Sequence, residues 1–429
     1  MKEGGQRLRV LLVAVKDLAG GAHRSAFRLH QALRVAGVDS IMAVRDKASS
    51  DPHVYQMSAA EMGWPRRGRG FLDRLPVSCL VNRDEPISLG LQSMRLEQVI
   101  DRLAPGVVHL HWVNGGMVGI AAAAMATRPV VWTMHDMWAF TGGCHYADDC
   151  TGFRGACSSC PKVKPWPIVR AVPHWVHARK SRLWGGRRLN AIAPSQWMAN
   201  AARESSLFAD ADVRKIGYCF DPTVFSPGGR EAARRRLGLL PEKSCVLFVN
   251  ASQPRKGAAM VSQIMQEMSQ MPAWSDSEFL FAGGLPTGVQ GDEPRVRLLP
   301  TTHDEAVMAE YFAAADLFVM PSLEDNLPNV VIESLACGTP VAAFAVGGIP
   351  EMITEGENGC LSAECTVAGM AEAIARLDPA TLRSRGEIAA DARAAYSQAE
   401  VSRQHVAFYR DVMQGRPSTE AGEECTPIK

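Results

Sequence analysis

The chain has 429 residues, of which 47% are apolar and 21% charged, and its 46 Lys and Arg residues nearly balance its 45 Asp and Glu residues. These proportions are those of ordinary globular proteins and exclude a wholly disordered, collagen-like or coiled-coil chain. A net charge of +1 creates no overall field toward a nucleic acid, so no nucleic-acid partner is expected. At about 150 residues per domain, the length predicts two or three domains.

No apolar run approaches the roughly 18 residues that are needed to cross a bilayer. The run Val10–Val15 is too short for a signal peptide and is better explained as a buried strand. We therefore expect a cytoplasmic protein, whose contact with a membrane, if it has one, is peripheral and on the inner face. Most of the eleven cysteines are then expected to be reduced thiols.

The first half of the chain alternates apolar strands with helices. Leu8–Val15 is a continuous apolar run, followed by a glycine-containing loop at Asp17–Ala22 and by a helical pattern that ends before Gly37. Ser40–Val44 completes a strand–helix–strand unit. Three more apolar strands follow at Val107–Leu110, Pro129–Thr133 and Ala191–Ala193. Continuous rather than alternating apolar residues indicate a parallel sheet that is covered on both faces.

A second series of strand–helix units fills the other half. Its predicted strands are Cys245–Asn250, Phe279–Ala282, Val296–Leu299, Leu317–Met320 and Pro340–Phe344. The join is expected in Gly217–Gly229, which contains two Pro and three Gly. The prediction is thus an α/β protein of two Rossmann-like parallel-sheet domains, residues 1–220 and 221–397, facing a central cleft. A terminal helix at 398–415 is expected to pack back on the first domain, and 416–429 to be a disordered tail.

An acidic cluster follows the strand Leu317–Met320. Glu324, Asp325 and Asn326 come near the strand end, and Glu333 lies eight residues after Asp325 within an apolar helical stretch. A carboxylate in such a stretch requires a partner, which the two hydroxyl groups of a ribose could supply. The alternative is a carboxylate satisfied by backbone N–H groups or by an ion pair.

Two cations, Arg255 and Lys256, stand where a strand-end loop enters a helix. A helix N-terminus favours anions, and Arg and Lys together would form a clamp for a diphosphate. A solvated basic pair is the alternative. Gly20 and Gly21 follow the first strand, where they would let the backbone approach a phosphate, although a Gly-Gly pair is equally an ordinary turn.

Histidines end two strands of the first domain. His135 follows Pro129–Thr133 and would face the cleft. His109, His111 and Trp112 end the neighbouring strand and are weaker candidates for lining the acceptor side. A lone histidine in such a place is more often structural than catalytic.

Two further segments carry unusual compositions. Cys144, Cys150, Cys157 and Cys160 fall within 17 residues and could bind one Zn²⁺ in a closed, structural site. Because only the last pair has the usual two-residue spacing, free thiols and disulfides stay open. The segment Trp64–Leu72 mixes Arg with aromatic residues, and each base could add about 1 kcal/mol of attraction to an anionic membrane. A solvated loop is the alternative.

In their order along the chain, these motifs resemble the family 4 glycosyltransferases, which are retaining enzymes of the two-domain GT-B fold. The resemblance covers residues 8–415 and rests on Gly20-Gly21-Ala22, Pro194-Ser195, Asp221–Pro227, Arg255-Lys256-Gly257, Pro321–Glu333, Ala336–Val341 and Gly347–Glu351. The stretch Pro321–Glu351 is its specific part. The cysteine-rich insert at 144–160 is similar to one in members that assemble bacterial exopolysaccharides of the colanic-acid type.

The resemblance implies transfer of a sugar from a UDP- or GDP-sugar to a hydroxyl group of a glycan or lipid-linked glycan, in cell-surface polysaccharide synthesis and without a catalytic metal. It implies that Glu333 binds the donor ribose and that His135 and Asp325 contact the donor sugar. The further residues it implies are Glu324, Asn326 and Gly348 in the donor loops, and Arg255, Lys256, Gly20 and Gly21 at the diphosphate.

The sequence departs from the family pattern in three places. Asp325 stands where most members have Glu, Asn250 and Ala251 stand where an additional Arg is usual, and Cys219-Phe220 replaces an Asn-Gly pair. Two other kinds of function therefore stay open. One is a catalytically silent sugar-nucleotide-binding or zinc-stabilised scaffold protein, and the other is an epimerase or phosphorylase on the same scaffold. The spacing of Asp325 and Glu333 favours the transferase.

Overall fold

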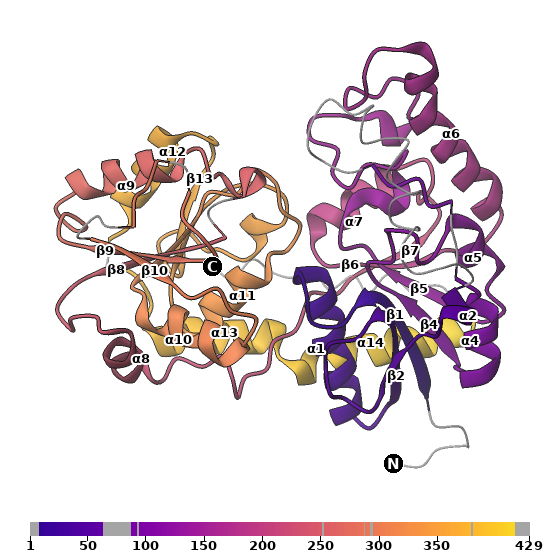
Figure 1. The fold of residues 1–429 in the computed structure, drawn as a ribbon, viewed down its shortest axis with the longest axis horizontal. Helices are drawn as coiled ribbons and strands as arrows, with labels where there is room; N and C mark the ends of the chain where they lie inside the picture. Colours follow the sequence, from indigo (N-terminus) through magenta and orange to yellow (C-terminus); the bar gives the residue numbers. More distant parts are fainter. Residues whose placement is uncertain are drawn as a thin grey trace.

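The computed structural model describes residues 8–62, 87–91, 94–250, 253–286, 288–291, 295–378 and 381–416. The basic, aromatic segment Trp64–Leu72 and residues 417–429 of the predicted tail lie outside these ranges. The chain forms two α/β domains that stand side by side (Figure 1). The prediction of two Rossmann-like parallel-sheet domains is confirmed.

The N-terminal sheet has seven parallel strands in the order β3-β2-β1-β4-β5-β6-β7. They are β1 (Arg9–Lys16), β2 (Asp39–Asp46), β3 (Val54–Gln56), β4 (Val107–Leu110), β5 (Val130–Thr133), β6 (Asn190–Ala193) and β7 (Asp212–Lys215). The helices around them are α1 (Gly21–Val35), α2 (Ala59–Met62), α4 (Leu96–Leu103), α5 (Ile120–Met125), α6 (Pro167–Trp184) and α7 (Gln196–Glu204), with short 3₁₀ turns η1 (Met137–Phe140) and η2 (Gly152–Arg154).

The C-terminal sheet has six parallel strands in the order β10-β9-β8-β11-β12-β13. They are β8 (Cys245–Val249), β9 (Glu278–Ala282), β10 (Val296–Leu299), β11 (Leu317–Met320), β12 (Val341–Phe344) and β13 (Gly359–Ser362). The accompanying helices are α8 (Arg230–Leu237), η3 (Pro254–Lys256), α9 (Val261–Gln270), α10 (Glu305–Ala314), α11 (Asn329–Ala336), η4 (Ile349–Glu351), α12 (Val367–Arg376) and α13 (Arg385–Tyr396).

Strand β1 shows why a continuous apolar run forms a central strand. Its side chains point alternately to opposite faces of the sheet. Leu11 and Val13 enter the core on one face, and Val10 and Leu12 enter the core on the other. Because both faces are covered, every position of the strand must be apolar.

The last helix, α14 (Gln398–Met413), leaves the C-terminal domain and runs beneath the N-terminal one (Figure 1). Its Val401, Phe408 and Tyr409 are buried in the same core as Val10 and Leu12 of β1. The chain therefore passes between the domains twice, and the N-terminal domain's core is completed by the end of the chain.

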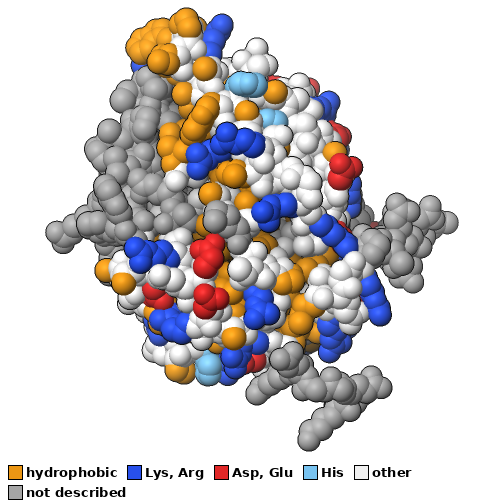
Figure 2. All heavy atoms as spheres, turned by 90° about the vertical axis from the view of Figure 1, so that its right-hand side faces the viewer, with side chains coloured by type: hydrophobic (Ala, Val, Ile, Leu, Met, Phe, Trp, Pro, Cys, Tyr) orange, Lys and Arg blue, Asp and Glu red, His pale blue; other side chains and the backbone are white. Residues whose placement is uncertain are grey.

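Helix α6 runs along the flank of the N-terminal domain that faces away from the C-terminal domain (Figure 1), the side onto which Figure 2 looks. Its Val169, Val176 and Trp184 are buried. The sequence patterns did not predict this helix, since Pro173 lies in its interior and weakens its helical signal. Within the described ranges, no helix is long and apolar enough to cross a membrane.

Candidate functional site

The site forms where both sheets reverse their strand order. The reversal lies between β1 and β4 in the first sheet and between β8 and β11 in the second. Parallel sheets bind ligands beyond the carboxyl ends of the strands at such a switch point. The loops after β1 and β4 contain Gly20, Gly21 and Trp112, and the loops after β8 and β11 contain Lys256 and Asp325. Topology alone thus places the predicted residues at two switch points.

The basic and acidic loops of the C-terminal domain contact each other directly. Lys256 Nζ donates a hydrogen bond to Asp325 Oδ2, and Arg255 Nη1 lies 3.6 Å from the same oxygen. The sequence predicted that both cations lie at a helix N-terminus. The structure places them instead in the 3₁₀ turn η3, because α9 begins only at Val261. Gly257 follows at φ +79°, and an added Cβ would come 2.1 Å from the Pro321 carbonyl oxygen, so only glycine permits this approach.

A buried ion pair connects the two domains at the predicted ribose site. Arg28 of α1, 1% exposed, donates from Nη2 to Glu333 Oε1 at 2.7 Å and from Nε to Glu305 Oε1 at 2.9 Å. Its guanidinium also lies 5.2 Å from the centroid of the Phe225 ring. No local sequence pattern marks Arg28, because its partners are 277 and 305 residues away along the chain.

Asn326 is a second connection between the domains. Its Nδ2 donates to the carbonyl oxygens of Met134 at 3.0 Å and His135 at 3.2 Å, and its Oδ1 accepts from Ser195 Oγ at 2.7 Å. All of its polar side-chain atoms are therefore engaged by the protein. Asn326 holds the loop of His135 against the acidic loop, which differs from the donor-sugar contact that the resemblance implies.

The other two donor-loop candidates also lie at this boundary. The N–H of Gly348 donates to the Asn326 carbonyl oxygen at 2.8 Å, and a Cβ at Gly348 would come 2.5 Å from Ser195 Cβ. Glu324 Oε1 accepts from the Asp148 N–H at 3.3 Å. Close approach of the domains thus requires a glycine at position 348.

Buried histidines extend from the domain boundary into the first sheet. His135 is hydrogen-bonded through Nδ1 to Tyr218 Oη at 2.8 Å and through Nε2 to His111 Nδ1 at 3.0 Å. His109 is bonded to Tyr409 Oη at 2.6 Å and Thr133 Oγ1 at 2.7 Å. With both ring nitrogens engaged, His109 has no atom left for an acceptor, and its role is to bind α14 to the sheet.

Burial keeps these imidazoles neutral. It lowers the pKa of His135 to about 3 and holds the pKa values of His109 and His111 well below the ordinary value. His135 therefore carries no charge at neutral pH and contacts a ligand only as a neutral group.

On the N-terminal side, an open cavity of about 480 Å³ is lined by Lys16, Gly20, Gly21, His23, Arg45, Trp112 and Asn114, among others. His23 Nδ1 and Asn114 Oδ1 are buried there without a hydrogen-bond partner in the described part of the chain. Buried polar atoms without partners are costly, so a ligand with hydroxyl groups would be stabilised at this place. Of the three acceptor-side candidates, Trp112 lines the cavity, and His109 and His111 do not.

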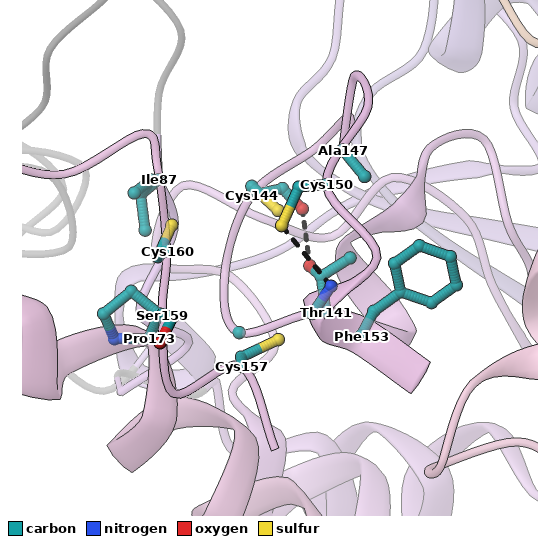
Figure 3. Close-up of a pocket in the computed structure, with 12 residues that line it drawn as sticks. Ile87, Thr141, Cys144, Ala147, Cys150, Phe153, Cys157, Ser159, Cys160 and Pro173 are labelled. Carbon is teal, nitrogen blue, oxygen red and sulfur yellow. Dashed lines mark hydrogen bonds between the residues drawn. The ribbon is translucent and has the colours of Figure 1, made fainter. Parts of the chain in front are cut away.

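The four clustered cysteines line one small cavity of about 20 Å³ in the N-terminal domain (Figure 3). None of them forms a disulfide, and the Gly152 N–H donates to Cys150 Sγ at 3.4 Å. Burial raises the pKa of Cys144 to about 12 and that of Cys157 to about 11. As they stand, no three His, Cys, Asp or Glu side chains of the described residues are grouped so that they could hold a metal ion.

Comparison with known proteins shows to which family this two-domain architecture belongs. The family model of the glycosyltransferase family 4 matches residues 19–224, and that of the group 1 glycosyl transferases matches residues 243–378. The chain belongs to the family 4 glycosyltransferases. A glycosyltransferase is therefore the enzyme class, and the two matches meet at the linker between the two sheets.

The relatives of this chain include proteins named D-inositol 3-phosphate glycosyltransferase. The one from Mycobacterium sp. (strain KMS) is 28% identical over 417 residues, which span 88% of this chain and 84% of that protein. The one from Geodermatophilus obscurus is 30% identical over 277 residues, which span 59% of this chain and only 55% of that protein.

Solved structures of similar proteins show the same fold. Sucrose-phosphate synthase from Thermosynechococcus elongatus matches with a TM-score of 0.67 at 20% identity, covering 95% of this chain and 100% of that one. Anabaena HepE, solved with UDP-glucose, matches with a TM-score of 0.63 at 16% identity, covering 94% and 100%. Both likenesses establish the GT-B arrangement of the two domains.

The buried histidines predict a loss of stability in mild acid. Burial lowers the pKa of His23 to about 4, of His135 to about 3 and of His405 to about 4, whereas the unfolded chain takes up these protons near pH 6.5. As pH falls from 6.5, each histidine should therefore cost the folded state about 1.4 kcal/mol per pH unit. Denaturant unfolding at several pH values between 7.5 and 5, above the range of most carboxylates, measures this slope.

His405→Gln should reduce that slope, and substitution of the exposed His53 by Asn should not. An unfolding free energy that is constant between pH 6.5 and 5 would contradict neutral, buried imidazoles.

Breaking the buried ion pair should cost far more than breaking an exposed one. Arg28→Met leaves Glu333 buried without its cation, and we expect a loss of about 3–5 kcal/mol in unfolding free energy. Arg9→Ala removes the pair of Arg9, 45% exposed, with Asp39 and should cost at most about 1 kcal/mol. Thermal and denaturant unfolding compare the two variants. Adding Glu333→Gln to Arg28→Met should recover part of the loss, and equal effects of the two single variants would contradict the assignment.

Proposed function

We propose that the protein transfers a sugar, with retention of anomeric configuration, from a nucleotide diphosphate sugar to a hydroxyl group of an acceptor. The observation that supports this most is the contact of the charged groups of the C-terminal domain with the N-terminal domain. Asn326, next to the Lys256–Asp325 pair, bonds the loop of His135, and Glu333 bonds Arg28 of α1. One cationic and two anionic groups there match the diphosphate, sugar and ribose of such a donor.

In this proposal, Lys256 and Arg255 stabilise the departing diphosphate. Without a donor, Lys256 pairs with Asp325 and Arg255 lies close to the same carboxylate. A diphosphate carries more charge than one carboxylate and would draw both cations to itself. Fixed cations at the place where negative charge develops lower the barrier electrostatically. Asp325, released from Lys256, would then be available to the hydroxyl groups of the donor sugar.

Glu333 would hold the ribose with the oxygen that Arg28 leaves available. Arg28 engages Oε1, and Oε2 accepts no hydrogen bond from the described residues. To orient the donor sugar, the neutral imidazole of His135 would exchange its hydrogen bond to Tyr218 Oη or to His111 Nδ1 for one to a sugar hydroxyl. A donor phosphate oxygen would take the proton of the acceptor hydroxyl on the same face of the sugar, which preserves the anomeric configuration. The contacts between the domains would limit the access of water to this reaction.

For the nucleotide of the donor, we propose UDP or GDP. HepE was solved with UDP-glucose, and starch synthase IV of Arabidopsis thaliana, with which this chain shares 13% identity, was solved with ADP and acarbose. The fold thus accepts different bases, and a panel of donors is required.

For the acceptor, we propose a glycan or lipid-linked glycan in cell-surface polysaccharide synthesis at the inner face of the membrane, with the protein itself cytoplasmic and its membrane contact peripheral. The cavity with Lys16, Arg45 and Trp112 is where the acceptor would bind. Because relatives are named D-inositol 3-phosphate glycosyltransferases, phosphorylated polyols belong in the acceptor panel.

The donor site predicts which variants lose turnover. Release of free nucleotide diphosphate from UDP-, GDP- and ADP-sugars should occur with one donor and fall by about 100-fold or more in Lys256→Ala. Glu333→Ala should raise the donor KM. Lys243→Ala, which removes an exposed pair with Asp276, serves as the matched control and should leave turnover unchanged.

Two outcomes would favour the alternatives. If no donor is turned over and no nucleotide raises Tm, the protein is a scaffold rather than a transferase. If a donor sugar changes configuration without release of the diphosphate, the protein is an epimerase.

Structural zinc at Cys144, Cys150, Cys157 and Cys160 is a further part of the proposal. A cavity of about 20 Å³ has room for one small occupant, and four thiols line it. Small movements of the loop would have to bring the sulfur atoms to the roughly 2.3 Å of a zinc–thiolate bond.

Elemental analysis of purified protein tests this directly, and we expect about one zinc per chain. Cys157→Ser should lose the metal and lower Tm, because a structural site contributes its binding energy to folding. Cys365→Ser, at an exposed cysteine, is the control. Absence of zinc with all thiols titratable in denaturant would establish free thiols, and a lower thiol count would establish disulfides.

A further inference from the structure

One segment departs sharply from the charge balance of the chain. Residues 151–203 contain ten Lys and Arg residues and no Asp or Glu, whereas the whole protein has a net charge of +1. Helix α6 occupies the middle of this segment. Lys162 and Lys180 of this segment are buried, whereas Arg170 and Arg182 are exposed on α6, which lies on the outer flank of the N-terminal domain, away from the C-terminal domain (Figure 1).

The same helix exposes large apolar side chains. Ile168 is 81% exposed and Trp175 47% exposed, and Trp166, which precedes the helix, is 55% exposed. Ile168, Ala171 and Trp175 are spaced by three and four residues, so they share one face of α6. Val169 and Val176 are buried on the other side. This helix is thus apolar on both sides, and among the described residues only one side is covered by its own domain.

Cations surround the exposed apolar face. Lys164 Nζ lies 5.3 Å from the centroid of the Trp166 ring, and the Arg179 guanidinium lies 5.7 Å from that of Trp175. Arg170 and Arg182 are exposed on the same helix. Figure 2 shows apolar side chains gathered at the upper end of this flank with Lys and Arg beside them. Within the described ranges, none of these four cations has an acidic partner in an ion pair.

We propose that Trp166 and the first half of α6 dock the protein on an anionic lipid surface. Exposed apolar groups on a soluble surface mark a binding site, and an apolar stripe flanked by Lys and Arg is the pattern of an interfacial helix. Tryptophan favours the boundary between water and acyl chains, and each nearby cation strengthens binding to anionic lipid. A nucleic acid suits this face less well, since Ile168 offers neither a ring for stacking nor a hydrogen-bonding group.

This surface deepens the peripheral membrane contact proposed above and depends on none of the donor-site residues. Because α6 lies on the flank opposite the C-terminal domain, docking would leave the domain boundary open to donor and acceptor (Figure 1). Loss of membrane binding and loss of transfer to a water-soluble acceptor are consequently separate observations.

Co-sedimentation of the full chain with vesicles tests the proposal. We expect binding to vesicles of 75% phosphatidylcholine and 25% phosphatidylglycerol at low salt, and at least tenfold weaker binding to pure phosphatidylcholine or in 0.5 M NaCl. Two variants should each bind at least tenfold more weakly. One is the triple variant Trp166→Ser, Ile168→Ser, Trp175→Ser, and the other is the double variant Arg170→Gln, Arg182→Gln. Val35→Ser and Leu298→Ser, at exposed apolar residues elsewhere, are matched controls and should bind like the wild type.

Ile168→Ser alone, at the most exposed position, serves if the triple variant does not fold, and it should still bind measurably more weakly. Release of nucleotide diphosphate should be unchanged in all of these variants. The proposal is overturned if the wild type does not bind anionic vesicles at low salt, or if the folded apolar variants bind as the wild type does. It is also overturned if a DNA duplex is bound more tightly than the vesicles and Ile168→Ser has no effect on either.

Discussion

The ion pair between Arg28 and Glu333 is the interaction on which the rest of the site depends. A charged pair that is almost fully buried is stable only while both members stay in place. Since Arg28 belongs to the first helix of the N-terminal domain and Glu333 to a helix of the C-terminal domain, the pair fixes the two domains relative to each other. It also orients the carboxylate that would receive the ribose, so ligand binding and domain contact involve the same group.

The charges of the site are balanced internally. Lys256 is paired with Asp325, and Arg28 is paired with Glu333 and Glu305. Both polar side-chain atoms of Asn326 form hydrogen bonds with the opposite domain. Arg28 Nη1 is an exception, since it is buried without a hydrogen-bond partner among the described residues. Because these charged groups are paired with each other, they can lie between two folded domains without a large penalty of desolvation. A dianionic ligand that binds Lys256 and Arg255 would have to replace their present protein partners.

The N-terminal domain contains two features that lie apart from the domain boundary. The cysteine-lined cavity and the cationic flank of α6 adjoin each other in sequence, and both lie outside the strands that form the sheet. A sheet tolerates such additional segments because loops beyond its strands can vary without disturbing its core. In the C-terminal domain, by contrast, the loops after β8 and β11 contain the basic and acidic groups that face the boundary between the two domains.

The sequence alone determined the two parallel sheets, because strands buried on both faces are apolar. It also determined that Lys256, Asp325 and His135 lie in strand-end loops and that Glu333 lies in the helix after the acidic loop. It could not reveal β3, β7 and β13, whose three or four residues lack a distinct pattern, nor α6, which contains Pro173 in its interior. Only the tertiary structure decided that Arg28 meets Glu333, that Asn326 connects the domains and that His109 supports α14. These contacts join residues 131 to 305 positions apart, and no local pattern encodes a partner at that separation.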